Sequence, residues 1–74
     1  MKFSDLKFDN LGCCDRHGAW ATVQHENGRR TEVHDIGNGM YRVVTFMGQV
    51  LTTGALETSD TAAIEARVLS DIAA

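Results

Sequence analysis

Two glycine-containing turns, ten residues apart, constrain this chain more than any other feature. Asn27-Gly28 and Gly37-Asn38-Gly39 supply residues that tolerate the positive φ angles of a two-residue hairpin turn. A third turn is predicted at Met47-Gly48. The segments between the turns are rich in β-branched and aromatic residues, which favour strands. We therefore predict an antiparallel meander of strands over residues 19–25, 30–36, 40–46 and 49–53.

Two-residue turns also predict the register of the strands. The predicted core face carries Trp20, Thr22, Val33, Val44, Phe46 and Leu51, with Thr22 opposite Val33, Val33 opposite Val44, and Val44 opposite Leu51. The second face is also fairly apolar, and we expect another segment to cover it. Its residues are Ala21, Val23, His34, Tyr41, Val43 and Val50.

After Gly54 the hydrophobic pattern changes period. Ile64, Val68 and Ile72 recur at a spacing of four, and Thr58-Ser59-Asp60 offers helix N-cap residues. We predict an amphipathic helix over residues 59–73, packed on one face of the sheet. The fold class is then α+β in a single domain of residues 1–74, with an N-terminal arm (1–18), the meander (19–53) and the helix. The apolar residues of the arm are expected to cover the second face, either of the same subunit or of a neighbouring one.

Length and charge limit the class of protein. A chain of 74 residues holds one thin core, and proteins of this size often add a disulfide, a metal or a second subunit. A homodimer is therefore one expectation. The net charge of −3 disfavours nucleic acid as a direct partner. No segment approaches the roughly 20 apolar residues of a membrane span, and residues 1–5 lack the apolar stretch of a signal peptide. We predict a cytoplasmic protein with no membrane partner.

Cysteine and histidine residues are the types that could support metal or thiol chemistry. Cys13 and Cys14 are adjacent, so their side chains diverge, and His17 follows three residues after Cys14. A zinc site needs about four ligands, and a thiol nucleophile needs more than proximity in sequence. We therefore predict no cofactor, no metal and no enzymatic activity, with a Cys/His metal or thiol protein as a minor alternative.

Acidic residues concentrate towards the C-terminal end, where Arg67 is the single basic residue after residue 56. Glu65 projects into the apolar stripe of the predicted helix, so its head either reaches water at the rim or pairs with a partner's Arg or Lys. An arginine pair follows the first turn. The predicted partner-binding candidates are Glu57, Asp60, Glu65, Asp71, Arg29, Arg30 and Tyr41.

The layout resembles that of very short proteins encoded by bacteriophages and prophages, including anti-CRISPR inhibitors. The shared features are a Met-Lys-Phe start, a glycine-punctuated meander over residues 20–53 and an acidic, Ala-rich helix over residues 60–74. The resemblance implies a non-catalytic inhibitor in a bacterial host cell. Such an inhibitor docks on a CRISPR effector through acidic side chains and interferes with its nucleic-acid binding. A small phage structural or assembly protein, working as a homo-oligomer, is the main alternative.

Overall fold

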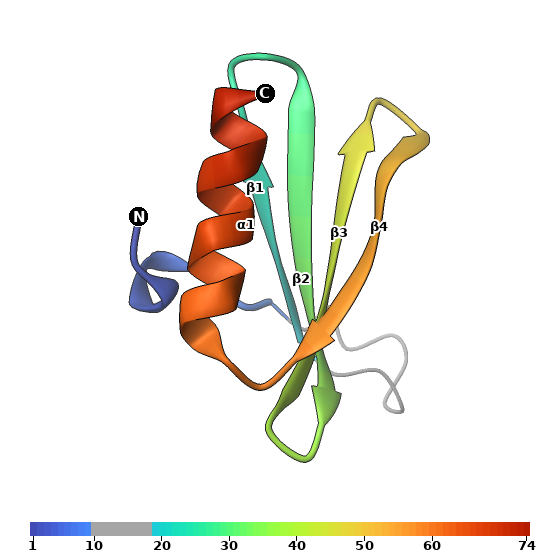
Figure 1. The fold of residues 1–74 in the computed structure, drawn as a ribbon. Coiled ribbons are helices and arrows are strands. Elements are labelled where there is room, and N and C mark those ends of the chain that lie inside the picture. Colours follow the sequence, from blue (N-terminus) through green and yellow to red (C-terminus); the bar gives the residue numbers. More distant parts are fainter. Residues whose placement is uncertain (10–18) are drawn as a thin grey trace.

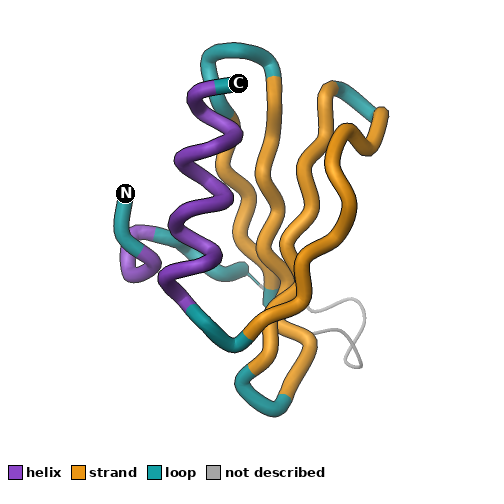
Figure 2. The backbone as a smooth tube through the Cα atoms, viewed as in Figure 1, coloured by secondary structure: helices purple, strands orange, loops and turns teal. Residues whose placement is uncertain are grey.

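A computed structural model describes residues 1–9 and 19–74 (Figure 1). Its elements are, in order, η1 (Phe3–Asp5), β1 (Trp20–Gln24), β2 (Arg29–Gly37), β3 (Met40–Met47), β4 (Val50–Thr58) and α1 (Thr61–Ala73). The strands form one antiparallel sheet in the order β1-β2-β3-β4, and α1 lies across one face of it (Figures 1 and 2). The predicted α+β meander with a C-terminal helix is confirmed. Most boundaries differ by one residue, but β4 continues to Thr58, past the predicted end at residue 53, and α1 begins after Asp60, two residues later than predicted.

The turn between β1 and β2 contains three residues rather than the predicted two. The N–H of Gly28 donates to the carbonyl of His25 at 3.1 Å, and the N–H of His25 donates to Arg29 at 2.8 Å. Gly28 takes up the positive φ of +89°, so the loop consists of Glu26, Asn27 and Gly28. A three-residue loop with glycine at its left-handed position is the next most common hairpin after the two-residue forms.

A bulge before the second turn also shifts the predicted register. Asn38-Gly39 has the expected two-residue form, with φ angles of +59° and +75°. A bulge between Asp35 and Gly37 then changes the pairing of β2 with β3. The three-residue first turn pairs Val33 with Ala21 in place of Thr22, and the bulge pairs it with Val43 in place of Val44.

A shift of one residue exchanges the two faces of a strand. The face under α1, called the helix face, carries Ala21, Thr31, Val33, Val43 and Thr45, all of them buried. The other face is called the open face. The predicted core residues Trp20, Thr22, Val44, Phe46 and Leu51 lie on it, so only Val33 of the predicted core face is buried as expected.

The core between α1 and the helix face is thin. Ala21, Val33, Val43, Ile64 and Val68 are its buried apolar residues. The N-terminal segment, residues 1–9, adds a cluster in which the rings of Phe3, Phe8 and Tyr41 have centroids 5.2 to 5.7 Å apart.

Tyr41 belongs to the second face that the N-terminal arm was expected to cover. Phe3 and Phe8 of the arm do contact it. That face is also the one that α1 covers, which was not predicted. Residues 10–18 of the predicted arm lie outside the described residues.

Side chains cap both ends of α1. Asp60, one of three predicted N-cap residues, accepts the N–H of Ala62 at 3.0 Å. At the other end, the Asn27 amide donates to the carbonyls of Asp71 at 2.7 Å and Ala74 at 3.0 Å. The Oδ1 of Asn27 also accepts the N–H of Arg29 at 2.9 Å. One side chain thus shapes the first turn and satisfies carbonyls that a helix end leaves unpaired.

The edge strand β4 pairs irregularly with β3. The register shifts between Val43 and Thr45 and again between Thr45 and Phe46, so β4 contains two bulges. Bulges bend a strand and increase its twist. They fall within residues 47–56, a stretch without a charged side chain.

We predict that Asn27→Asp destabilises the domain at least as much as Asn27→Ala. Aspartate keeps the acceptor for Arg29 but replaces the amide donor with an oxygen that faces helix carbonyls. Losing such a cap costs about 1 kcal/mol, which urea unfolding at pH 7 measures. A near-neutral Asn27→Asp would show that the turn bond matters and the helix cap does not.

Candidate functional site

The open face is the candidate functional site, because aromatic and charged side chains meet there in an ordered pattern. The strand register places them in three rows: Gln24, Arg30, Phe46 and Leu51; then Thr22, Glu32 and Val44; then Trp20, His34, Arg42 and Glu57. The helix α1 and residues 3–8 pack on the helix face. Within the part of the chain that the structure describes, no helix therefore covers these rows.

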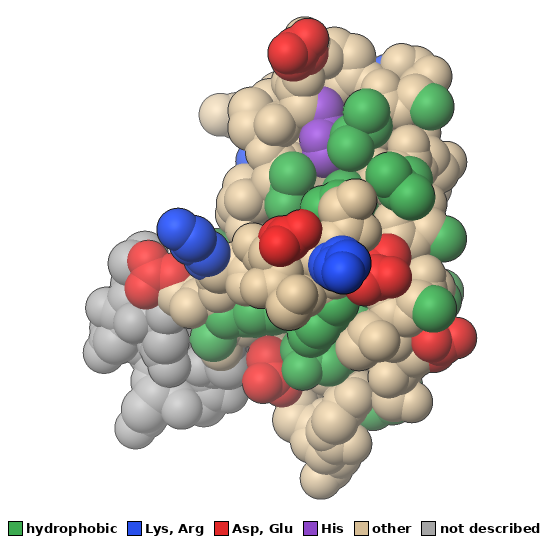
Figure 3. All heavy atoms as spheres, turned by 90° about the vertical axis from the view of Figure 1, so that its left-hand side faces the viewer, with side chains coloured by type: hydrophobic (Ala, Val, Ile, Leu, Met, Phe, Trp, Pro, Cys, Tyr) green, Lys and Arg blue, Asp and Glu red, His purple; other side chains and the backbone are tan. Residues whose placement is uncertain are grey.

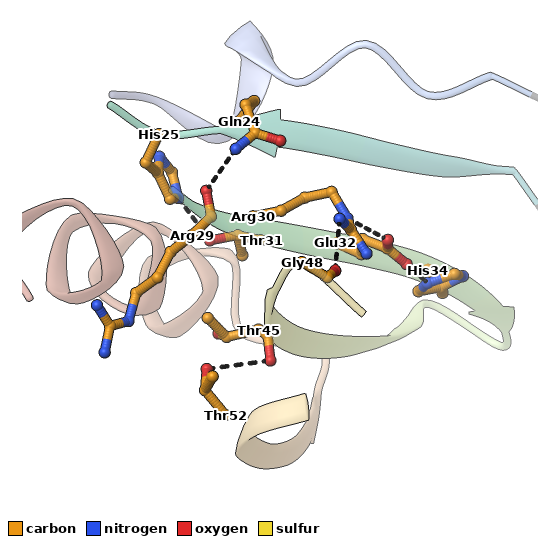
Figure 4. Close-up of polar contacts among 10 residues, drawn as sticks. All are labelled: Gln24, His25, Arg29, Arg30, Thr31, Glu32, His34, Thr45, Gly48 and Thr52. Atoms are coloured by element: carbon orange, nitrogen blue, oxygen red, sulfur yellow. Dashed lines mark hydrogen bonds and ion pairs between the residues drawn. The ribbon is translucent and has the colours of Figure 1, made fainter. Parts of the chain in front are cut away.

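Glu32 holds the centre of the open face together (Figure 4). Its Oε2 accepts from Arg30 Nε at 2.7 Å, and its Oε1 lies 3.1 Å from His34 Nε2. The Arg30 guanidinium lies over the ring of Phe46, 4.8 Å from its centroid, and also donates to the carbonyl of Gly48 at 3.1 Å. Each of these contacts restricts a rotamer before any partner binds.

In the third row, a second side chain that binds Glu32 also lies over an aromatic ring. The imidazole of His34 stacks on Trp20, with centroids 6.1 Å apart and planes inclined by 21°. Thus both nitrogen groups that bind Glu32 lie against an aromatic ring. At the far end of the row, Arg42 and Glu57 form an ion pair at 2.7 Å between β3 and β4.

These rows surround a shallow hollow of about 630 Å³ in the open face. Apolar and charged side chains share its lining, which is made of Trp20, Glu32, His34, Asp35, Ile36, Arg42, Val44 and Phe46. Arg30 and Arg42 balance Glu32 and Glu57, so the rows carry no net charge while His34 is neutral. The three rows therefore offer aromatic surface and paired ions, and they do not create a field of one sign.

The environment of Glu32 also sets its ionisation. Partial burial raises the pKa of its carboxyl, but the hydrogen bonds and charges of Arg30 and His34 outweigh burial and bring the pKa below the ordinary value of 4.5. Glu32 therefore stays ionised at neutral pH and holds both of its partners.

The structure places two of the predicted partner-binding residues, Arg30 and Glu57, on the open face, where they lie in its first and third rows and do not contact each other. Tyr41 instead packs against Phe3 and Phe8. Asp60 caps α1. The side chain of Arg29 points away from the Arg30 and Glu32 pair (Figure 4).

The two acids of α1 that were expected to face a partner are used within the chain. Glu65 accepts the backbone N–H of Phe3 at 2.5 Å and so holds the N-terminal segment to the helix. Asp71 is only 5% exposed, beneath α1. The prediction that Asp71 belongs to an exposed acidic surface is therefore wrong, because the helix turns this carboxylate towards the sheet.

Asp71 lies at the centre of a buried polar network. Its Oδ2 accepts the hydroxyls of Thr31 at 2.5 Å and Thr45 at 2.7 Å. Arg67 approaches Asp71 Oδ1 at 3.7 Å and donates to the Thr45 hydroxyl at 3.1 Å. His25 Nε2 lies 2.7 Å from the Thr31 hydroxyl, whose single hydrogen goes to Asp71, so Nε2 of His25 must carry the donating hydrogen.

Sequence reasoning missed most of this site, and its signals were ambiguous. Trp20, Val44 and Phe46 are apolar residues at alternate strand positions, so periodicity alone places them in a core. Thr31 and Thr45 gave no signal, since a buried threonine looks like any strand residue. Arg30, Glu32 and His34 follow one another at intervals of two residues, which places them on the same face of a strand. This spacing could have indicated that Glu32 contacts both Arg30 and His34.

The predicted thiol and metal candidates are only partly described. Cys13, Cys14 and His17 lie outside the described residues. Among residues 1–9 and 19–74, no three His, Cys, Asp or Glu side chains gather to hold a metal ion. The two described histidines, His25 and His34, contact Thr31 and Glu32.

Comparison with known proteins gives this chain no relative. No family model, no curated protein and no solved structure matches it. Within the described residues, none of the helices combines the length and the apolar character that crossing a membrane requires. The function must therefore be inferred from the surfaces themselves.

We predict that Asp71→Ala destabilises the domain by about 3 kcal/mol, because it leaves Arg67 and two threonine hydroxyls without their buried acceptor. Asp60→Ala is the matched control, since it removes an exposed carboxylate of the same helix and should cost about 1 kcal/mol. Denaturant unfolding measures both. Equal losses would show that the buried network adds nothing beyond helix capping.

We predict that Glu32→Gln lowers the free energy of unfolding at pH 7. The lowered pKa of Glu32 means that its stabilising effect is present above pH 4.5 and is lost as the pH falls through the lowered value. The difference between variant and wild type should therefore shrink in acid. Glu26→Gln, in the exposed first turn, is the control, and an equal pH dependence in both variants would contradict the prediction.

Proposed function

We propose that this chain is a non-catalytic protein-binding protein, an inhibitor or adaptor, which docks on its partner through the open face. The observation that carries the proposal is the central position of Glu32. It binds Arg30 and His34 at once, while each of these lies against an aromatic ring.

The residue types of the open face favour a protein partner. Tryptophan and arginine are the side chains that most often dominate the free energy of protein association. Trp20, Arg30 and Arg42 supply them here, with Phe46 and the exposed Leu51 beside them. The shallow hollow suits a protruding side chain of a partner better than an enclosed small molecule.

The contacts within the rows also lower the cost of binding. Ordering a free, rotamer-rich side chain at an interface costs about 0.5–1.5 kcal/mol. Arg30 and Arg42 already have fixed acceptors, and His34 is fixed between Glu32 and Trp20. A partner therefore meets a surface whose long side chains are largely in place.

The ionisation of Glu32 supports a non-catalytic role. A general acid or base works best when its pKa lies near the working pH. The arginine and histidine beside Glu32 move its pKa in the opposite direction, further into acid. The same neighbours suit Glu32 to a permanent ion pair.

The candidate partner is the one that the sequence resemblance implies, a CRISPR effector in a bacterial host cell, with interference in its nucleic-acid binding as the effect. The proposed contact differs from the acidic mimicry of that resemblance, because Glu65 and Asp71 are used inside the chain. Docking through a face of paired charges should depend only weakly on salt.

Neighbouring arginines provide the test. Binding of purified CRISPR effector complexes to the immobilised chain is measured by interferometry for wild type, Trp20→Ala, Arg30→Ala and Arg29→Ala. Trp20→Ala and Arg30→Ala should weaken binding at least tenfold, as residues at the centre of an interface do. Arg29→Ala, which removes the same charge one residue away, should change it little.

Each outcome decides a different part of the proposal. Equal losses in Arg29→Ala and Arg30→Ala would indicate general electrostatic attraction and reject the open face. If no effector complex binds, the CRISPR partner is rejected. The same variants, applied to proteins captured from a bacterial lysate, then test the open face independently.

A further inference from the structure

The two edges of the sheet differ in regularity. Strand β1 pairs with β2 over five consecutive residues without a bulge, whereas β4, at the opposite edge, contains two bulges. Bulges and charged side chains are the usual means by which a sheet edge avoids pairing with another chain. The sequence of β1, Trp-Ala-Thr-Val-Gln, contains no charged residue. The outer edge of β1 is therefore the one that can accept a further strand.

The alternation of hydrogen bonds shows which groups of β1 point outwards. In an antiparallel ladder, residues that bond to the neighbouring strand alternate with residues that point away from it. The carbonyl of Ala19 accepts the N–H of Asp35 at 2.9 Å, and the N–H of His25 donates to the carbonyl of Arg29 at 2.8 Å. The odd-numbered residues of this stretch therefore bond to β2. The residues whose N–H and C=O groups point outwards are Trp20, Thr22 and Gln24.

The first of these residues already has an antiparallel partner. The N–H of Trp20 donates to the carbonyl of Asp9 at 3.1 Å, and its carbonyl accepts the N–H of Asp9 at 2.8 Å. Residues 3–8 then pack against the core on the helix face and leave the edge. Among the described residues, no hydrogen bond reaches the N–H or C=O of Thr22 or Gln24, and both residues are exposed. The pairing that Asp9 begins thus stops at Trp20.

Apolar side chains of α1 lie beside this edge. Glu65, Leu69 and Ile72 follow one another at intervals of four and three residues, so they share one side of the helix. That side faces the N-terminal segment, because Glu65 accepts the N–H of Phe3. Leu69 is 51% exposed and Ile72 49% exposed. Figure 3, which faces the side of the molecule where α1 and the N-terminus lie, shows hydrophobic side chains gathered around a histidine in its upper half.

A hollow of about 670 Å³ separates the end of β1 from the last turn of α1. Its lining is made of Gln24, His25, Glu26, Asn27 and Ile72. Val23 points to the same side of the sheet, because it pairs with Thr31 of the helix face. Helix α1 packs mainly over β2, β3 and β4, so the space beside β1 is open on this side. A strand added to β1 would meet these apolar side chains with its own.

We infer that β1 binds an extended segment of a partner protein by strand addition. In an antiparallel segment, the residues opposite Thr22 and Gln24 each exchange a pair of backbone hydrogen bonds with them. The residue between them lies opposite Val23 and points to the helix-face side, where Ile72 and Leu69 lie. That residue should therefore be apolar. Its two neighbours point to the open-face side and can be polar.

The chemistry of the free groups favours an extended chain as the occupant. Thr22 and Gln24 present both donors and acceptors along one line, and phosphate groups could satisfy only the donors. A second copy of β1 fits poorly. If its Gln24 lay opposite Thr22, its residue 26 would fall opposite Trp20, where Asp9 already lies. The inference rests on the proposed function, because it also requires a protein partner, and it adds a contact next to the open face.

Amide hydrogen exchange, followed by NMR, tests the inference with a short acetylated peptide in which threonine alternates with valine. In the free protein, the amides of Thr22 and Gln24 should exchange fast, and the amide of Val23, which bonds to β2, should exchange slowly. Saturating peptide should slow the exchange of Thr22 and Gln24 by about tenfold or more. The same peptide with methylated amide nitrogens keeps its side chains but lacks the donors, and it should leave both amides fast.

Variants of the protein test the two parts of the site separately. Thr22→Pro removes an outward N–H and keeps the bonds to β2, so it should fold and lose peptide binding, since edge strands tolerate proline where the N–H faces solvent. Thr22→Ala is its matched control and should bind as wild type does. Ile72→Glu should weaken binding by about tenfold, because it places a carboxylate beside the apolar side chain of the peptide. Ser70→Glu, on the outer side of α1, should not.

Several results would overturn the inference. They are no protection by the unmethylated peptide, equal protection by the methylated one, or unchanged binding to a folded Thr22→Pro. Protection that rises with protein concentration in the absence of peptide would also overturn it, because a second copy would then be the occupant. If thermal unfolding shows that Thr22→Pro does not fold, Ile72→Glu and the methylated peptide still decide.

The peptide experiment contains no effector complex, so the two proposals can fail separately. Effector binding through the open face without protection of Thr22 and Gln24 would reject the edge site alone. Protection by the peptide without any effector binding would reject the CRISPR partner and keep the edge site.

Discussion

The carboxylate of Asp71 connects α1 to the two central strands of the sheet. It accepts hydroxyls from Thr31 of β2 and Thr45 of β3, and Arg67 extends the network to Gly54 of β4. A buried charge without partners costs several kcal/mol, so α1 is stable only where these groups converge. The buried apolar residues are few and of small or medium size, so this polar network favours the packing in which all of its groups are paired. The position of the helix in turn determines which face of the sheet stays open.

The class and order of elements could be predicted from the sequence because glycine turns, strand-forming residues and a spacing of four are local signals. The faces could not, because they depend on whether a turn contains two residues or three. Asn27-Gly28 is compatible with either turn length. In the observed three-residue turn, the amide of Asn27 donates to carbonyls in the last turn of α1. That contact lies 44 residues away in sequence, so no local pattern reveals it.

The candidate site was only partly predictable for the same reason. Arg30 and Glu57 were recognised as charged surface residues, but their neighbours Trp20 and Phe46 were assigned to the core. Once the register is known, the rows follow directly from alternation along each strand. The acids of α1 show the reverse error, since an acidic residue on an amphipathic helix is normally exposed and Asp71 is not. The sequence shows that α1 contains the acidic residues Glu65 and Asp71. Only the tertiary structure shows that both are used in contacts within the chain.

The two bulges of β4 have a consequence for the behaviour of the protein in a crowded cell. Residues 47–56 are uncharged and rich in β-forming side chains, and Val50 and Leu51 are mostly exposed. Segments of this composition stack into cross-β fibrils when their backbone repeats evenly. Because the bulges make the backbone N–H and C=O groups of β4 unevenly spaced, an incoming strand cannot pair with them regularly. Many natural sheet edges use bulges in this way. The bulges in β4 thus oppose fibril growth at an edge whose residues 47–56 carry no charge.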